Sequence, residues 1–293
     1  MPLYAGVELG GTKCVCTLAR GHQEILEQIT VPTTAPDETL AAIERVLLEW
    51  QDNEPVDALG IGSFGPIDLD RDSSTYGRIT TTPKPGWAGT DVAMRLRRAL
   101  SVPIGFDTDV NGAALAEAKW GAGQGLRDLA YVTVGTGVGV GLVGDGKPVH
   151  GLGHPEAGHI RIARMPGDNW PGSCPFHGDC VEGLASGPAI KARLGVEHLH
   201  DFSSDHPVLE TVAWALAQLC HALVCTAAPS TILIGGGVVT GQPHLIDRTG
   251  QLLVESLASY ISLPAGRPYV QAPGLGVQAG PLGSIALAME AAA

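Results

Sequence analysis

One order of secondary-structure elements occurs twice in this sequence, and it constrains the fold more than any other feature. Residues 4–20 read as a strand, a Gly-Gly-Thr turn and a second strand, and residues 130–143 repeat this order around another glycine turn. Each hairpin leads into a further strand, near residues 24–30 and 147–150. A single glycine-turn hairpin is common in α/β proteins, but the repeated order favours an internal duplication. We therefore expect two α/β lobes with a cleft between them.

Helices and strands alternate after each hairpin, as expected for α/β lobes. The first half predicts helices over 36–50, 90–100 and 111–121, with strands at 56–63 and 102–107. The second half predicts helices over 188–194, 206–228, 243–260 and 281–292, with strands at 231–234 and 269–272. We expect an N-terminal lobe over 1–112 and a C-terminal lobe over 113–280. The last helix, within 281–293, is expected to pack back on the first lobe.

The charge balance limits the partners of the chain. The 293 residues include 18 basic and 30 acidic side chains, which gives a net charge of −12 at pH 7. This balance disfavours nucleic acid and anionic membranes as partners. The N-terminus lacks the features of a signal peptide, and no apolar run approaches the length of a membrane span. We expect a soluble cytoplasmic protein.

Glycine-rich turns lie where a nucleotide could be held. In the first turn, Gly10 and Gly11 leave backbone N–H groups free to face phosphate oxygens, and Thr12 adds a hydroxyl donor. Lys13 could add charge or could be solvated. The other two turns are Gly135-Thr136-Gly137 and Gly235-Gly236-Gly237. The first two turns, facing each other, could clamp a polyphosphate, and the third allows close approach of a flat ring or a helix start. Each alone is more commonly a turn without a ligand, but the set of three favours a nucleotide site.

These motifs resemble those of the ROK family of sugar kinases, within the actin-like ATPase superfamily and its ribonuclease H-like fold. Residues 8–13 look like the family's first phosphate motif, 135–137 its second and 235–237 its adenosine motif. The resemblance implies lobes of the βββαβαβα type, ATP and Mg²⁺ as cofactors and a homodimer. Most of the family has Asp where this chain has Glu8, a carboxylate that helps to hold Mg²⁺ through water. A Glu there is similar to the fructokinase subgroup.

Asp107 and Asp109 lie at a predicted strand-to-helix junction. A kinase that phosphorylates a hydroxyl needs a carboxylate to accept the proton as the oxygen attacks phosphorus. Asp109 could also be the N-cap of the helix over 111–121, and the two roles are compatible. The resemblance implies that Asp109 is the catalytic base, and we expect Asp107 to be structural.

The resemblance also implies a sugar pocket that draws on both lobes. Its expected members are Gly65, Pro66, Glu156, His159 and Glu182. Carboxylates suit this role because each accepts hydrogen bonds from several hydroxyls, although Glu182 could instead be a solvated surface charge.

Further residues are candidates for contact with the substrate. Thr108 stands where the family usually has an Asn that contacts the sugar, so contact through Thr108 or through Asn111 stays open. Lys84 and Trp87 are candidates for substrate contact or for shaping a lid.

Cys174, His177 and Cys180 have the spacing of a metal-binding knuckle. Two thiolates and two imidazoles form a closed tetrahedral Zn²⁺ site, which is structural because no position is left for a reactive water. The residues alone leave His150, His154 and His159 open as the fourth ligand, and the resemblance implies His159. The alternative is a Cys174–Cys180 disulfide. The remaining cysteines, Cys14, Cys16, Cys220 and Cys225, are expected to be reduced core residues.

The sequence thus predicts a kinase that uses ATP to phosphorylate a hexose at the 6-hydroxyl, with D-fructose as the favoured substrate. A mannokinase or glucokinase is the close alternative. A sugar-sensing regulator and a zinc hydrolase are alternatives from other classes.

Overall fold

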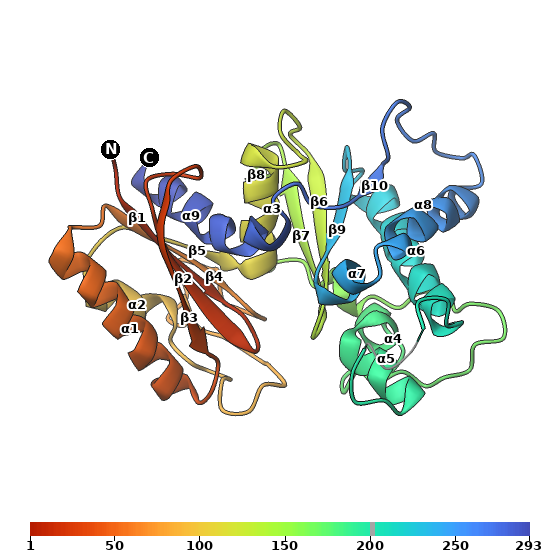
Figure 1. Ribbon diagram of the computed structural model, residues 1–293, viewed down its shortest axis with the longest axis horizontal. Helices are drawn as coiled ribbons and strands as arrows, with labels where there is room; N and C mark the ends of the chain where they lie inside the picture. The colour runs from red at the N-terminus through yellow and green to blue at the C-terminus, as the bar shows by residue number, and fades with distance from the viewer. Residues whose placement is uncertain (200–202) are drawn as a thin grey trace.

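The computed structural model describes residues 1–199 and 203–293 and contains two five-stranded sheets, one on each side of the molecule (Figure 1). The strands of the first sheet are β1 (Tyr4–Leu9), β2 (Lys13–Ala19), β3 (Ile25–Pro32), β4 (Ala58–Ser63) and β5 (Ile104–Thr108). Those of the second are β6 (Leu129–Val134), β7 (Val138–Gly144), β8 (Lys147–Pro148), β9 (Ile232–Gly235) and β10 (Val270–Gln271).

The two sheets have the same connectivity. The first has the order β3-β2-β1-β4-β5 and the second, taken from its other end, has the order β8-β7-β6-β9-β10. In the first sheet β1 pairs antiparallel with β2 and parallel with β4. In the second, β6 pairs antiparallel with β7 and parallel with β9. The predicted duplication is therefore confirmed in topology and in strand direction.

Helices pack around these sheets, and most lie where the sequence predicts them. They are α1 (Pro36–Asn53), α2 (Ala93–Leu100), α3 (Asp109–Trp120), α4 (Val181–Ala185), α5 (Gly187–Leu194), α6 (Val208–Thr226), α7 (Gly237–Gly241), α8 (His244–Leu257) and α9 (Ala279–Ala292). Short 3₁₀ turns occupy Ala157–His159 and Gly276–Gln278. The five-residue helices α4 and α7 were not predicted, because one turn is too short to show a helical period.

Helix α2 begins later than the predicted start at residue 90. Asp91 forms a β-bridge with Arg78, and the N–H of Ile79 donates to the carbonyl of Thr90 over 3.0 Å. These bonds hold the backbone of the two residues in an extended form, so helical geometry starts only at Ala93.

Helices α3 and α9 lie between the two sheets (Figure 1). Helix α9 packs against β1, β4 and β5 as well as against α3, although it is the last element of the chain. Gly60 on β4 allows this approach, because a Cβ there would overlap the carbonyl oxygen of Ser284. We propose lobe limits at 1–112 and 113–280, with 281–293 returning to the first lobe.

Helix α6 belongs to the core of the second lobe. It is long and apolar enough to cross a membrane by length and composition, but 67% of that stretch is buried inside the protein, which makes it weak evidence for a span. The helix buries Cys220 but exposes Cys225, so the prediction of a core position is wrong for Cys225. Cys225 lies near the C-terminal end of α6, beyond the part that the second core covers.

Candidate active site

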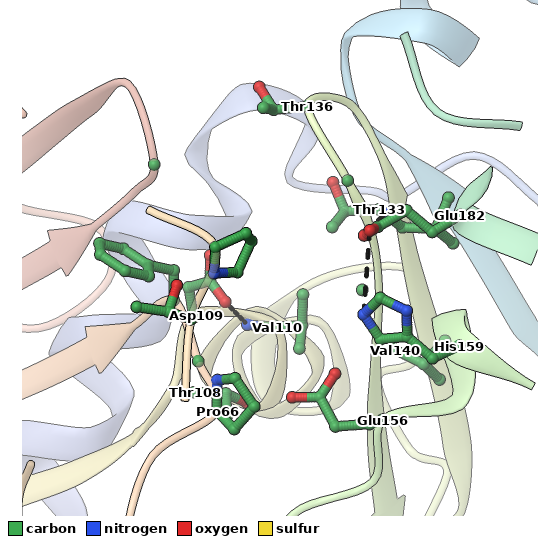
Figure 2. A pocket seen from close by; sticks show the side chains of 18 of the residues that line it. Pro66, Thr108, Asp109, Val110, Thr133, Thr136, Val140, Glu156, His159 and Glu182 are labelled. Atoms are coloured by element: carbon green, nitrogen blue, oxygen red, sulfur yellow. Dashed lines mark hydrogen bonds and ion pairs between the residues drawn. The ribbon is translucent and has the colours of Figure 1, made fainter. Parts of the chain in front are cut away.

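A cavity of about 890 Å³ is lined by residues of both lobes. The first lobe contributes Gly11, Gly65, Pro66, Thr108 and Asp109. The second lobe contributes the turn at 135–137 together with Glu156, His159 and Glu182. Figure 2 shows Asp109 on one side of this space and Glu156, His159 and Glu182 on the other. The predicted base and the predicted sugar ligands are therefore brought to one cavity.

Asp109 is the first residue of α3, directly after β5. The helix is capped by Thr108, whose Oγ1 accepts the N–H of Asn111 over 3.1 Å, so the alternative that Asp109 is the N-cap is wrong. Asp109 Oδ1 accepts the N–H of Val110 over 2.9 Å, and the carboxylate faces the cavity (Figure 2). Burial raises the pKa of Asp109 to about 6.

Asp107 and Asn111 form a buried network behind Asp109. Asp107 Oδ1 accepts the N–H of Thr108 over 2.7 Å and the Asn111 side-chain amide over 2.8 Å. Asn111 Oδ1 in turn accepts the N–H of Leu142 on β7 over 3.2 Å. Asn111 is fully buried and lies outside the cavity lining, whereas Thr108 is part of it. The network joins the two lobes and fixes the start of α3.

The first two glycine turns reach the cavity to different extents. Gly11 lines it, and the space around the missing Cβ of Gly11 and of Gly135 is open. Gly10, Thr12 and Lys13 lie outside the lining, whereas the whole turn at 135–137 is part of it. The open sides of the two turns leave room for phosphate oxygens.

The third glycine turn lies beside the second and not in the cavity lining. Gly236 has φ +92°, and a Cβ there would come within 2.5 Å of the backbone of Val134 at the end of β6. Gly237 faces open space instead. Of the three glycines in this turn, only Gly237 therefore leaves room for a flat ring such as the adenine of a nucleotide.

Glu8 ends near the start of α9, where its carboxylate fills the space that a Cβ on Gly280 would need. Burial raises the pKa of Glu8 to about 7, with a further contribution from the charge of Asp109. The two carboxylates therefore lie close enough to repel each other. Glu8 itself lies outside the cavity lining.

Glu156 and His159 are held on the opposite wall by one turn. The N–H of His159 donates to the carbonyl of Glu156 over 3.0 Å. Gly158, between them, lets this turn pack against β7, because a Cβ there would overlap the carbonyl of Val138. Burial raises the pKa of Glu156 to about 7, and the charges of Glu182 and Asp109 add to the shift.

Glu182 is tied to the second glycine turn. Its Oε2 accepts the N–H of Val138 over 3.1 Å, and its Oε1 lies 3.8 Å from His159 Nε2. The carboxylate also sits where a Cβ on Gly137 would be. Glu182 is thus a fixed, half-buried wall of the cavity, and the alternative of a solvated surface charge is wrong.

The ligand atoms of His159, Cys174, His177 and Cys180 lie within 4.8 Å of one another. His159 Nδ1 is 3.6 Å from Cys174 Sγ and 3.7 Å from Cys180 Sγ. A tetrahedral zinc ion places its nitrogen and sulfur ligands about 3.6 Å apart, so the cluster fits Zn²⁺. Cys174 and Cys180 are free thiols, which is contrary to the disulfide alternative.

This cluster, which we call the knuckle, is connected to the predicted sugar ligands through His159 and Cys180. His159 turns Nδ1 toward the sulfurs and Nε2 toward Glu182. Cys180 is the N-cap of α4, where its sulfur accepts the N–H of Gly183, and Glu182 is the second residue of that helix. A metal bound in the knuckle would therefore fix the positions of His159 and Glu182 together.

Two histidines near Glu156 have roles that the sequence did not reveal. His154 Nε2 accepts the N–H of Ile67 over 3.0 Å, and its Nδ1 lies 3.4 Å from Glu156 Oε1. His150 Nε2 lies 2.8 Å from Asp107 Oδ2. Both rings thus link the segment that carries Glu156 to the first lobe. Their closeness to Glu156 in the chain was the available signal, but it does not show which atoms the rings contact.

Lys84 and Trp87, the candidates for substrate contact or a lid, lie in different surroundings. Lys84 lines the cavity, and its Nζ donates to the carbonyl of Gly11 over 2.5 Å. Trp87 is fully buried, and its Nε1 donates to the carbonyl of Thr34 over 2.9 Å. Contact of Trp87 with a substrate is therefore excluded in this structure, because the first core encloses the ring.

The duplicated sheets and the cavity between phosphate turns and carboxylates define a phosphotransferase of the actin-like ATPase fold. Residues 4–291 match the model of the ROK family, and the chain belongs to that family. A fructokinase from Zymomonas mobilis is 42% identical over 296 residues, covering 99% of this chain and 97% of that protein. A fructokinase from Lactococcus lactis is 40% identical over 272 residues, covering 92% of this chain and 91% of that protein.

A solved structure agrees with this assignment. The crystal structure of a ROK hexokinase from Thermus thermophilus has a TM-score of 0.80 at 26% identity and covers 98% of both chains.

Proposed function

We propose that this protein uses ATP to phosphorylate a hexose at its 6-hydroxyl, with D-fructose as the preferred substrate. The observation that carries the proposal is the half-buried carboxylate of Asp109, with its pKa raised to about 6, opposite Glu156 and Glu182 in one cavity. Relatives named fructokinase at 40% and 42% identity support the choice of fructose.

Asp109 acts as the general base. A carboxyl group with a pKa near 6 is mostly ionised at pH 7 and still accepts a proton readily. As the 6-oxygen of the sugar attacks the γ-phosphorus of ATP, the hydroxyl proton passes to Asp109. The new O–P bond forms while the bond from the γ-phosphorus to its bridging oxygen breaks, and ADP leaves.

The sugar is oriented by groups from both walls. Glu156 and Glu182 accept hydrogen bonds from its hydroxyls, and His159 Nε2 lies beside Glu182 in the same wall. Gly65 and Pro66, on the first lobe, close the other side. Thr108, which directly precedes Asp109 in the chain and carries a hydroxyl, also lines this cavity. Holding the 6-hydroxyl between Asp109 and the phosphate turns makes the attack effectively intramolecular.

The first two glycine turns would bind the phosphates through the backbone N–H groups of Gly11, Thr136 and Gly137. The N–H groups of Gly10 and Gly135 already donate to the carbonyls of Lys13 and Gly137, so the prediction of a free N–H is wrong for Gly10. Gly237 leaves the open side for the adenosine. Glu8 would help to hold Mg²⁺ through water, and the ion would neutralise phosphate charge. His159, Cys174, His177 and Cys180 would hold Zn²⁺ as a structural ion. With all four positions filled by protein, the knuckle leaves no place for a metal-activated water. This closed site argues against a zinc hydrolase.

A coupled ADP-release assay over fructose, mannose and glucose tests the proposal. We expect the highest kcat/KM with fructose, and NMR of the product should show phosphate on the 6-oxygen. Absence of sugar-dependent ADP release from folded, zinc-loaded protein would contradict the proposal. Light scattering of the same sample tests the homodimer that we propose from the family resemblance.

A further inference from the structure

Lys84 brings a cation to the first phosphate turn from a different part of the chain. Its Nζ donates to the carbonyl oxygen of Gly11 over 2.5 Å, and both residues line the cavity that contains Asp109. Gly11 has open space on the side where a Cβ would lie. A phosphate group held by this turn would therefore come within reach of the ammonium group.

The charges around the cavity explain why a cation is needed there. The described residues that line it include Asp109, Glu156 and Glu182 but, apart from Lys84, no lysine or arginine. Asp109 and Glu156 both have raised pKa values, and the charges of neighbouring carboxylates contribute to the shift at Glu156. A polyphosphate adds more negative charge to this space, so one mobile cation at the phosphate turn has a strong electrostatic effect.

The loop that carries Lys84 is anchored from behind. Trp87 is fully buried, donates to the carbonyl of Thr34 and contacts the ring of Phe64 edge-on at 5.2 Å between centroids. The N–H of Trp87 donates to the carbonyl of Lys84 over 3.2 Å, and the N–H of Lys84 bonds Thr82 Oγ1 over 3.3 Å. The backbone of Lys84 is therefore fixed, while its flexible stem lets the ammonium group move across the turn.

We propose that Lys84 is a catalytic residue that leaves the carbonyl of Gly11 and binds the γ-phosphoryl group of ATP during transfer. The inference rests on the proposed kinase function. As the bond between the 6-oxygen and phosphorus forms and the bond to ADP breaks, negative charge develops on the oxygens around phosphorus. The ammonium group stabilises that charge and exchanges no proton, because the hydroxyl proton goes to Asp109.

Lys84→Met tests this role, since methionine keeps the length of the stem and removes the charge. We expect kcat with fructose to fall by about 10²-fold, with a change in the KM for fructose of less than about threefold. Lys84→Arg keeps a cation and should retain at least roughly a tenth of the wild-type kcat. Lys147→Met removes an exposed lysine on β8 and should leave kcat unchanged.

Nucleotide binding gives a second readout that does not depend on turnover. Lys84→Met should weaken the binding of a non-hydrolysable ATP analogue about tenfold but leave ADP binding within about twofold. Equal losses for both nucleotides, or a kcat within twofold of wild type, would overturn the role of Lys84. If the wild type phosphorylates no hexose, the proposed function fails, and the nucleotide titration still decides whether Lys84 contacts the γ-phosphoryl group.

Discussion

The two walls of the cavity hold their functional groups in different ways. On the first wall, Asp109 is positioned by the backbone, because β5 runs directly into α3 and Thr108 caps that helix. On the second wall, His159 and Glu182 lie on a 3₁₀ turn and a five-residue helix, which are too short to be stable alone. We propose that a metal bound in the knuckle supplies the cross-link that these short elements need.

This difference suggests that the first wall carries the group that reacts, whereas the second wall holds the groups that position the sugar. The proposed base, Asp109, needs an environment that tunes its proton affinity, and burial at the strand-to-helix junction provides one. The proposed sugar ligands need fixed positions, and a closed metal site can provide these without taking part in the reaction. Damage to the first wall should therefore lower kcat, whereas damage to the second should raise KM and lower stability.

The largest effect is expected for Asp109→Asn. An amide keeps the size of the side chain but cannot accept the hydroxyl proton, so kcat should fall by about 10²–10⁴-fold. The ADP-release assay measures this loss. Asp52→Asn, on the exposed side of α1, is the matched control and should retain wild-type turnover.

Loss of a knuckle ligand should have the next largest effect. Cys174→Ala should raise the KM for fructose by about 10-fold or more and lower the melting temperature by roughly 10 °C, because a structural metal stabilises the fold that it links. Steady-state kinetics and calorimetry measure the two changes. Cys225→Ala, an exposed cysteine outside the knuckle, is the control. Unchanged melting and unchanged KM in zinc-free protein would show that the second wall is stable without metal.

Acidic pH should remove the base reversibly. Burial raises the pKa of Asp109 to about 6, so the ionised, active form dominates above that pH and is lost below it. We expect kcat to fall roughly tenfold between pH 7 and pH 5. Melting curves at both pH values must show folded protein. A kcat that is constant down to pH 5 would be inconsistent with a base of this pKa.

Glu182→Gln should have the smallest effect. The amide oxygen can still accept the N–H of Val138, but it is a weaker acceptor for sugar hydroxyls. The KM for fructose should rise about 5-fold with little change in kcat. Glu49→Gln, on the exposed side of α1, should change neither value. A large loss of kcat with an unchanged KM would instead mean that Glu182 takes part in the phosphoryl transfer and does not only position the sugar.

The sequence predicted the hairpins and the ligand cluster well because both depend on local rules. Glycine turns between alternating apolar strands specify β1–β2 and β6–β7, and the spacing of Cys174, His177 and Cys180 allows few geometries. The position of Asp109 in the cavity was also predicted, but its relation to the helix was not. Strand β5 runs one residue further than expected, and this moves the capping role to Thr108.

Contacts between distant segments could not be read from the sequence. Asn111 looked available to a sugar, but it is buried in the core, where its side chain bonds Asp107 and Leu142. His154 looked like a rival metal ligand, but it contacts Ile67 across the lobes. Trp87 looked like part of a lid, and packing behind Phe64 buries it. These roles depend on packing between segments that are distant in the chain, which no local pattern encodes.

The most direct test of the division between the two walls is calorimetric titration of fructose into Asp109→Asn and Cys174→Ala, each saturated with a non-hydrolysable ATP analogue. The account predicts a Kd within about threefold of wild type for Asp109→Asn and a Kd weakened about 10-fold or more for Cys174→Ala. The reverse pattern, with binding lost at Asp109 and kept at Cys174, would contradict it.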